Sequence, residues 1–283
     1  MNPFIDVLAS LVAVVLGLHA LALAGIVGRE RLAMARANVE RNVRNSWGVA
    51  VVLASVLVLN KVVRDVGVEL SWLVGARITG RIYDLEGTFV ASVQSLASAE
   101  LTWFFGGMYV YGYVFLLTFP LVAYAIDENW RPLRELLVAY VVNYGVGLAC
   151  YVAFVAYGPR NFMPELVESL LYVQWPDVQL LTSRVNRNTN VFPSLHTSLS
   201  ATVALVAARY RSTYPRWLPV AVVCAASIAT ATLYLGIHWL TDVVAGLALA
   251  YGAVAFARRY VAGDDQVESD AANATATRPS DDD

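Results

Sequence analysis

The chain contains 283 residues, of which 58% are hydrophobic, and its formal net charge at pH 7 is −2. Its mean hydropathy of +0.56 argues against a soluble protein. The near-neutral charge gives no indication of nucleic-acid binding, which depends on clustered positive charge. Several apolar runs approach or exceed the ~20 residues that a helix needs to cross a bilayer. The composition therefore predicts an all-α, polytopic membrane helix bundle.

The apolar runs predict about seven transmembrane helices. We expect them at residues 4–27, 47–63, 101–126, 136–157, 194–210, 217–235 and 239–256. The first run is long and no charged segment precedes it, which favours a membrane span over a cleaved signal peptide. The two cysteines, Cys150 and Cys224, both fall inside apolar runs. We therefore expect small buried residues rather than a disulfide or a metal site.

Three further segments differ from the spans in composition. Residues 64–100 mix apolar and charged side chains, which fits either one or two amphipathic helices at the membrane interface or a folded loop. The polar connector at residues 158–190 is expected to contain a short helix near 164–173. The tail, residues 263–283, is acidic, rich in small residues and without hydrophobic periodicity, so it should be disordered. The remainder, residues 1–262, forms a single membrane domain.

Arginine is distributed unevenly between the two sets of connectors. The richer set comprises the connectors after the first, third and fifth spans, together with the end of the seventh span. Connectors rich in arginine and lysine stay on the cytoplasmic side of a membrane. We therefore expect a multi-pass protein of the cell membrane, with the N-terminus outside and the tail in the cytoplasm.

The stretch Phe192-Pro193-Ser194-Leu195-His196-Thr197 follows a polar loop and opens an apolar segment. Pro193 suits the first turn of a helix, where its missing N–H is not needed. Ser194 can accept a hydrogen bond from other unpaired N–H groups at that end. The positive end of a helix dipole with free N–H groups is an anion site, and His196 lies in its first turn. A capped membrane helix with an incidental histidine is the alternative.

A second stretch, Gly236-Ile237-His238-Trp239-Leu240-Thr241-Asp242, lies between two later apolar runs. His238 and Asp242 are four residues apart, so on a helix they share a face and can touch. A carboxylate bound to one imidazole nitrogen fixes the tautomer and leaves the other nitrogen free to attack. Both histidine stretches fall on the predicted outer side. The third histidine, His19, is isolated in an apolar run and should be packed or lipid-facing.

Together the two stretches resemble the type 2 phosphatidic acid phosphatase superfamily. That family has a proline-serine-x-histidine motif at a helix start, followed later by a histidine with aspartate four residues on. PSLH at Pro193–His196 and HWLTD at His238–Asp242 match both motifs in order, and the resemblance covers roughly residues 138–259. Leu195 replaces the commonest third residue, glycine, a variant similar to the branch that contains inositol phosphorylceramide synthases. The resemblance implies a six-helix core beginning at the second predicted span.

The resemblance also implies a role for each matching residue. His238 would be the nucleophile that forms a phosphohistidine, and Asp242 would orient it. His196 would be the general acid that protonates the leaving oxygen. Ser194 and the N–H groups after it, beginning with Leu195, would bind the phosphoryl oxygens. This chemistry needs no metal or other cofactor, and the sequence offers no compact histidine and carboxylate cluster of metal-ligand type.

The chain departs from the family pattern at two cationic positions. The first family motif pairs a lysine with an arginine about seven residues later, and here Ala153 stands at the lysine position before Arg160. The last motif usually begins with serine-arginine, and here it begins with Ala231 and Thr232. Arg160 is therefore the best remaining phosphate ligand. Weaker candidates in the same connector are Arg184 and Arg187.

Three functions remain open on these observations. The resemblance favours a membrane enzyme that cleaves a lipid phosphate ester at the outer face. The alternative is a phosphotransferase, which passes the phosphoryl group or phospho-headgroup to an alcohol. A non-catalytic lipid-phosphate binder is a third class, although binding alone would need only cations and N–H groups. In each case the expected partners are a lipid phosphate and the surrounding membrane lipids, with no nucleic acid.

Overall fold

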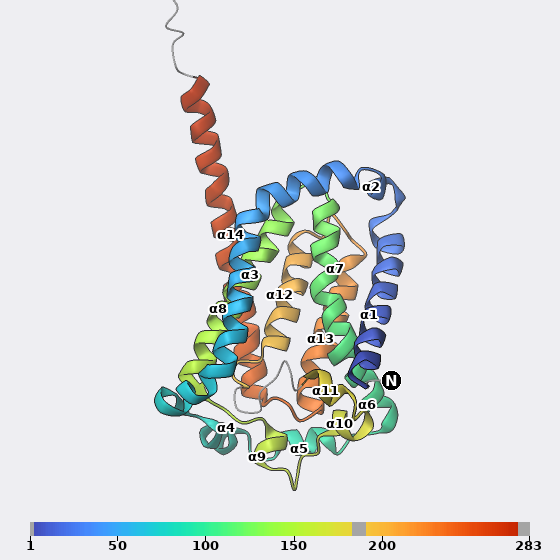
Figure 1. The fold of residues 1–283 in the computed structure, drawn as a ribbon, viewed down its shortest axis with the longest axis vertical. Helices are drawn as coiled ribbons and strands as arrows, with labels where there is room; N and C mark the ends of the chain where they lie inside the picture. Colours follow the sequence, from blue (N-terminus) through green and yellow to red (C-terminus); the bar gives the residue numbers. More distant parts are fainter. Residues whose placement is uncertain (1–2, 183–190, 277–283) are drawn as a thin grey trace, which may run out of the picture.

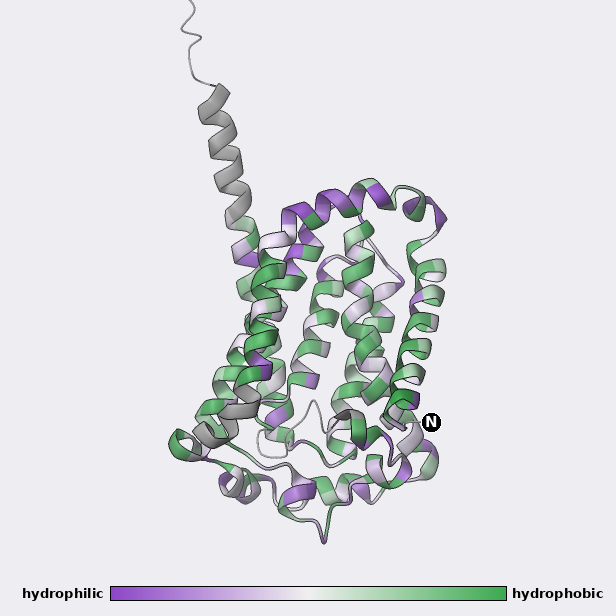
Figure 2. Ribbon diagram, viewed as in Figure 1, coloured by the Kyte–Doolittle hydropathy of each residue, from purple (hydrophilic) through white to green (hydrophobic). Residues whose placement is uncertain are grey.

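The long helices run side by side as one bundle, with short elements gathered at its two ends (Figure 1). The computed structural model describes residues 3–182 and 191–276, without the side chains of 63–70, 181–182 and 264–276. Helix accounts for 81% of the structure, with almost no strand. Hydrophobic residues follow the middle of the bundle and hydrophilic ones gather toward its ends (Figure 2). The predicted all-α, polytopic membrane bundle is therefore confirmed.

The long helices correspond to the predicted spans in order. The first is α1 (Pro3–Ala22), which the π-helical turn η1 (Leu23–Val27) extends, and the second is α3 (Ala35–Val74). The third is formed by α6 (Ala99–Gly107), the π-helical turn η2 (Met108–Gly112) and α7 (Tyr113–Ile126), which continue one another. The remaining four are α8 (Arg131–Ala153), α12 (Leu195–Arg209), α13 (Trp217–Tyr234) and α14 (Leu240–Ala276). Short α2 (Arg29–Ala33) joins α1 to α3.

Six candidate spans occur in the described part of the chain, one fewer than predicted. The helix that falls short is α12, which has 15 residues. Its length is about 22 Å at about 1.5 Å per residue, against a hydrocarbon thickness of about 30 Å. Leu199, Val203 and Val206 on α12 are almost fully buried, and the helix packs against α8, α13 and α14. Because its neighbours cover most of its surface, α12 is a central helix of the bundle and does not itself need to match the bilayer.

Helix α3 is longer at both ends than the predicted span 47–63. Residues 35–47 contain neither proline nor glycine, so a helix formed in the apolar run can continue through them. Asn42 is fully buried there, and its side-chain amide donates to the carbonyl oxygen of Asp127 at 2.7 Å. The extension therefore supplies a hydrogen-bond donor where α7 has just ended.

The structure also differs from the prediction of a disordered tail. Helix α14 continues to Ala276, beyond the point at Gly263 where composition indicates disorder. The sequence there contains several alanines, which have the highest helix propensity. A helix that is already formed also propagates without the cost of a new nucleus. The rest of the predicted tail, residues 277–283, lies outside the described residues.

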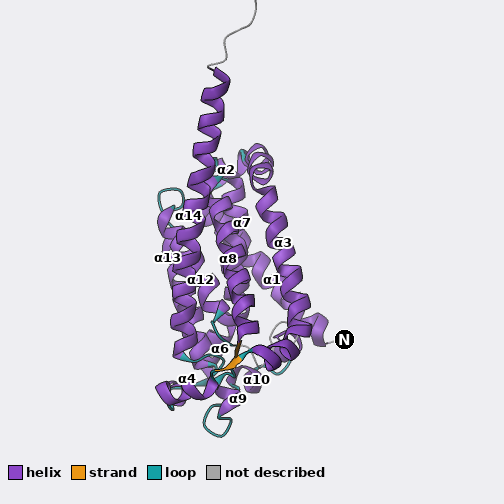
Figure 3. Cartoon of the chain, turned by 90° about the vertical axis from the view of Figure 1, so that its left-hand side faces the viewer, coloured by secondary structure: helices purple, strands orange, loops and turns teal. Residues whose placement is uncertain are grey.

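The two long connectors fold into short elements at the end of the bundle where α12 and α14 begin, called the histidine end below (Figures 1 and 3). They are β1 (Ala76–Arg77), α4 (Thr79–Glu86), α5 (Phe89–Gln94), β2 (Phe154–Val155), α9 (Pro159–Phe162), α10 (Leu170–Gln174) and α11 (Val178–Thr182). The helix predicted near 164–173 begins only at Leu170, because residues 164–169 form turns and bends. Leu171 in α10 is buried in an apolar cluster, which anchors this short helix to the bundle.

Backbone and amide hydrogen bonds fix these connectors to the bundle. Strands β1 and β2 pair in parallel, with Ala76 opposite Phe154. The Gln94 side chain donates to the carbonyl oxygens of Tyr234 and Glu168, each at 3.0 Å, and accepts from the Glu168 N–H at 2.9 Å. The 64–100 segment is therefore the end of α3 followed by a hydrogen-bonded cap of short helices.

The third histidine, His19, and the two cysteines lie within the long helices α1, α8 and α13. His19 lies edge-on to Phe115 and Phe119, with ring centroids 5.5 and 5.9 Å away, so it packs inside the bundle. Cys150 and Cys224 are free thiols and only half-buried.

Helices α12 and α14 approach closely near their starts, and Gly246 permits this approach. A Cβ added at Gly246 would lie 2.6 Å from the carbonyl oxygen of Ser194, closer than real Cβ atoms come to backbone. Six residues later on the same helix, a Cβ at Gly252 would meet nothing within 4 Å. These two glycines therefore provide a matched pair for testing the contact.

We predict that Gly246→Ala destabilises the protein and Gly252→Ala does not. Forcing a methyl group into the α12–α14 contact should cost about 1–3 kcal/mol, as overpacking does elsewhere. At Gly252 the same change should be neutral or should stabilise, because alanine favours a helix over glycine by about 0.5–1 kcal/mol. Thermal unfolding of both variants in one detergent measures the difference. Equal melting temperatures for the two variants would contradict the close backbone approach.

Candidate active site

The start of α12 is a capped helix end that carries the PSLH motif. The hydroxyl of Ser194 accepts a hydrogen bond from the Thr197 N–H at 3.3 Å and donates to the Thr197 hydroxyl at 3.0 Å. Pro193 precedes this cap instead of lying in the first turn as predicted. Leu195 and His196 are the first two helical residues, and N–H groups at those positions have no partner within a helix. The helix start therefore presents donors toward an anion.

His196 lies between two tyrosine rings. Its imidazole stacks on Tyr109, with ring centroids 4.3 Å apart and planes 17° apart. It also lies against Tyr113, with centroids 4.2 Å apart and planes 35° apart. Tyr109 belongs to the π-helical turn η2, and Tyr113 is the first residue of α7. Sequence reasoning did not identify these tyrosines as site residues, although aromatic side chains are frequent in residues 103–115.

His238 and Asp242 are in contact at the start of α14. The Nδ1 atom of His238 lies 3.3 Å from Oδ2 of Asp242, and both side chains are buried. The same Oδ2 accepts the Trp239 N–H at 2.9 Å. Asp242 Oδ1 is buried and has no hydrogen-bond partner among the described residues. The carboxylate is therefore held on one side by the backbone and on the other by the imidazole, which leaves Nε2 of His238 turned away from it.

The backbone before His238 is also held. The carbonyl oxygen of Thr232 accepts the N–H groups of Ile237 and His238, both at 3.0 Å. Gly236, which lies between the end of α13 and Ile237, adopts a φ of +68°, a value that favours glycine. Thr232 stands where the family pattern has an arginine, so this position serves here to hold the chain rather than to bring a charge.

Arg160 lies next to this turn in a buried position. Its N–H donates to the Gly236 carbonyl oxygen at 3.0 Å, and its guanidinium lies over the Tyr172 ring, 4.7 Å from the centroid. Only 8% of the residue is exposed. Its Nη1 is buried without a hydrogen-bond partner among the described residues. No carboxylate of the described residues forms an ion pair with it, so its charge is available to another anion.

One backbone hydrogen bond joins the two motifs. The Ser194 N–H donates to the Asp242 carbonyl oxygen at 3.1 Å, so the starts of α12 and α14 lie side by side. His196 lies in the first turn of α12 and His238 two residues before α14 begins, so both histidines lie at these adjacent helix starts. The structure therefore brings together six predicted site residues, namely His196, His238, Asp242, Arg160, Ser194 and Leu195. The two weaker candidates, Arg184 and Arg187, lie outside the described residues.

Glu86, at the end of α4, is a further residue of this region. Its carboxylate accepts the N–H groups of Leu240 and Thr241, at 2.8 and 2.5 Å. These are the first two N–H groups of α14, directly before Asp242. Sequence reasoning missed Glu86 for two reasons. It lies about 150 residues before its partners, and its segment was compatible with either amphipathic helices or a folded loop. A remote side chain thus performs the capping role that usually belongs to the residue before a helix.

In the described part of the chain, no group of three or more histidine, cysteine, aspartate and glutamate side chains lies together as metal ligands would. His238 and Asp242 form a pair by themselves, and His196 is flanked by aromatic rings.

The family comparison covers the region just described. A family model for the PAP2 superfamily matches residues 84–256. That range contains both histidine motifs, Arg160, Glu86 and the two tyrosines that flank His196. Comparison with curated proteins and with solved structures gives no match.

We predict that Glu86→Ala loosens the start of α14. Loss of a helix cap typically costs about 0.5–2 kcal/mol, so the variant should melt below wild type. Glu165→Ala is the matched control, because Glu165 is an exposed carboxylate in the other connector at the same end. Tryptophan fluorescence during thermal unfolding provides the measurement. If both variants melt alike, Glu86 does not hold α14.

Proposed function

The chain belongs to the PAP2 superfamily, and we propose that it cleaves the phosphate ester of a lipid at the histidine end of the bundle. Membership supports a phosphatase or phosphotransferase type of activity. The observation that carries the proposal is the buried contact between His238 Nδ1 and Asp242 Oδ2 at 3.3 Å. This contact lies beside the start of α12, whose unpaired N–H groups can bind an anion.

His238 is the proposed nucleophile. Because the Asp242 carboxylate accepts a hydrogen bond from Nδ1–H, the proton stays on Nδ1 and the lone pair on Nε2 is free. Nε2 forms a bond to phosphorus while the bond between phosphorus and the ester oxygen breaks. The electron pair leaves with the ester oxygen, which takes a proton from His196 in its imidazolium form and leaves that ring neutral. Asp242 stabilises the positive charge that develops on the imidazole.

Three groups are arranged to stabilise the phosphoryl oxygens. The N–H groups of Leu195 and His196 belong to the start of α12, where unpaired donors and the helix dipole both favour an anion. The unpaired Nη1 of Arg160 adds a full positive charge. Fixed donors and charges of this kind lower the barrier most where water is excluded, and the burial of Arg160 and Asp242 supports such an environment.

In the second step, water attacks the phosphohistidine. The bond between Nε2 and phosphorus breaks, free phosphate leaves, and neutral His196 accepts a proton from the attacking water. Both histidines return to their starting protonation states. The cycle uses the side chains of this chain alone, so we propose a metal-independent reaction.

A lipid substrate fits the surroundings of the site. The histidine end carries partly exposed tryptophans, Trp72 and Trp103, a residue type that gathers at membrane interfaces. A cavity of about 360 Å³ lies at this end, lined in part by Trp72, Arg77 and Tyr157. The carbonyl oxygen of Tyr157 accepts the Trp239 indole N–H at 2.8 Å, which connects this cavity to the residue after His238. A lipid headgroup can approach along it from the bilayer.

We also propose that the histidine end faces the outside of the cell membrane and the tail faces the cytoplasm. The opposite end carries α2 and the first turns of α3, which are strongly hydrophilic in Figure 2. Their arginines, with those that follow α7, α12 and the apolar part of α14, give that end the richer positive charge.

A phosphotransferase is the second candidate, and the position of Leu195 favours it. This leucine replaces the usual glycine of the motif, and its side chain packs against α8 at Gly147. A Cβ added at Gly147 would lie 2.7 Å from Leu195 Cδ2. This packing shows that the leucine fits the fold, whereas the transferase proposal itself rests on the resemblance of the motif to the branch that contains the inositol phosphorylceramide synthases. An alcohol would then replace water in the second step.

We predict that the two histidines respond differently to the leaving group. His238→Ala should abolish turnover of every substrate, because the nucleophile is always needed. His196→Ala should lose about 10²–10⁴ in rate on an alkyl phosphate such as phosphatidic acid, the usual contribution of a general acid. On an aryl phosphate such as nitrophenyl phosphate the loss should be much smaller, because nitrophenolate leaves without a proton. Rates under single-turnover conditions measure the difference.

Equal losses on both substrates would mean that His196 does not donate the proton. Wild-type protein incubated with labelled lipid also separates the two candidate functions. Release of free phosphate without an added alcohol supports the phosphatase, whereas product that appears only with an alcohol acceptor supports the phosphotransferase. Absence of both reactions, with tight binding of the lipid, would favour a non-catalytic binder.

We predict that Arg160 is the most important cation of the site. Arg160→Ala should lower the rate by about 10²–10³, as loss of one transition-state donor does in other enzymes. Arg184→Ala and Arg187→Ala should have smaller effects. Arg81→Ala is a control at the same end, because Arg81 is an exposed arginine of α4 that lines neither the site nor the cavity beside it. Equal, small effects for all four variants would show that other groups bind the phosphate.

A further inference from the structure

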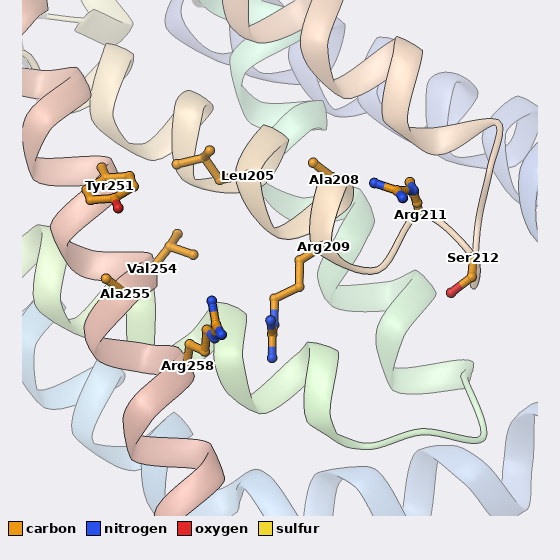
Figure 4. A pocket seen from close by; sticks show the side chains of 9 residues that line it. All are labelled: Leu205, Ala208, Arg209, Arg211, Ser212, Tyr251, Val254, Ala255 and Arg258. Carbon is orange, nitrogen blue, oxygen red and sulfur yellow. The ribbon is translucent and has the colours of Figure 1, made fainter.

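A second cavity lies at the opposite end of the bundle, between α12 and α14. Its volume is about 510 Å³, and the gap between the two helices is shown in Figure 4. We call it the α12–α14 cleft. Its lining residues come from the last turns of α12, the loop after it and the middle of α14, and they are Leu205, Ala208, Arg209, Arg211, Ser212, Tyr251, Val254, Ala255 and Arg258.

The cleft carries more positive than negative charge. Arg209 and Arg258 project into it from the two facing helices (Figure 4), and Arg211 lines it from the loop. Arg209 donates through Nε to the buried carboxylate of Glu135 at 3.0 Å. Neither Arg211 nor Arg258 forms an ion pair with any described residue. Three guanidinium groups therefore share one carboxylate, and an added anion would relieve their mutual repulsion.

The chemistry of the cleft selects a phosphate rather than a simple halide. A guanidinium presents a planar set of donors that matches two oxygens of a phosphate. Two arginines on facing helices with a third beside them can bind such a group from several sides. Ser212 adds a hydroxyl donor at the edge of the cleft.

The other wall of the cleft is apolar and faces the bilayer. Leu205 and Tyr251 are 38% and 72% exposed, on helices whose exposed side chains meet lipid in a membrane. Val254 and Ala255 continue this wall toward Arg258. A free phosphate would make no use of that surface, whereas the acyl chains of a lipid would lie along it. Basic pockets between membrane helices bind anionic headgroups for this reason.

We propose that the α12–α14 cleft binds an anionic phospholipid of the leaflet opposite the catalytic site. The phosphate contacts Arg211 and Arg258, with Arg209 beside them, and the acyl chains follow Leu205 and Tyr251. The lipid bridges α12 and α14 far from the histidines. Because the same two helices begin at the two histidine motifs, this lipid stabilises the helix pair on which the site is built.

Lipid-dependent melting of the full-length protein tests the proposal independently of catalysis. In a neutral detergent, phosphatidylglycerol should raise the melting temperature of wild type, and phosphatidylcholine with the same acyl chains should not. Arg211→Gln/Arg258→Gln should lower the affinity for phosphatidylglycerol about a hundredfold or more, since each substitution removes a charged hydrogen bond that is worth about tenfold or more in affinity. Arg36→Gln/Arg259→Gln is the matched control, with the same charge change at exposed arginines of the same end outside the cleft.

Each outcome decides the proposal. Loss of the lipid effect in the cleft variant alone supports it. Equal loss in both double variants would show diffuse attraction to positive charge and overturn the site. An equal rise in melting temperature with water-soluble glycerol phosphate would show that the cleft binds free phosphate and not a lipid. If the double variant does not fold, Arg211→Gln and Arg258→Gln are measured singly, and unchanged affinity in both would contradict the proposal.

Discussion

A single backbone hydrogen bond, from the Ser194 N–H to the Asp242 carbonyl oxygen, joins the starts of α12 and α14. The donors of one helix and the histidine–aspartate pair of the other can share a phosphate only while these two starts remain together. Gly246 permits the approach, because any larger residue would collide with the Ser194 carbonyl. The arginine joins the same assembly through backbone, from the Arg160 N–H to Gly236. Main-chain contacts, together with the glycine that permits the closest of them, therefore determine the geometry of the proposed site.

Sequence reasoning succeeded where the determining contacts are local. The bundle follows from apolar runs, the Ser194 cap from residues three apart, and the His238–Asp242 contact from a spacing of four. It failed where partners are distant in the chain. Neither the tyrosines on His196 nor the Glu86 cap on α14 can be read from nearby residues, because both depend on how connectors and helices pack. The bounds of α12 were predicted to within one residue at each end, because they too follow from a local apolar run.

The π-helical turn η2 shows how a local irregularity serves the site. A π-turn places one extra residue in a helix, and such turns occur frequently at functional sites. Here the turn contains Tyr109 and ends directly before Tyr113, the two residues whose rings contact His196. Aromatic faces on an imidazole restrict the orientations of the ring. The α6–η2–α7 helix thus contributes to the site by positioning a side chain rather than by supplying a reactive group.

The anchoring of the α4–α5 connector has a consequence for substrate traffic. The Glu86 carboxylate holds the first N–H groups of α14, Gln94 holds the end of α13, and β1 pairs with the chain that follows α8. A connector attached in this way does not open as a lid, because its displacement would remove support from the helix that carries Asp242. In the proposed reaction, substrate and product would then exchange sideways, between helices and through the bilayer. Turnover would accordingly depend on the fluidity and lateral pressure of the membrane as well as on the chemistry at the histidines.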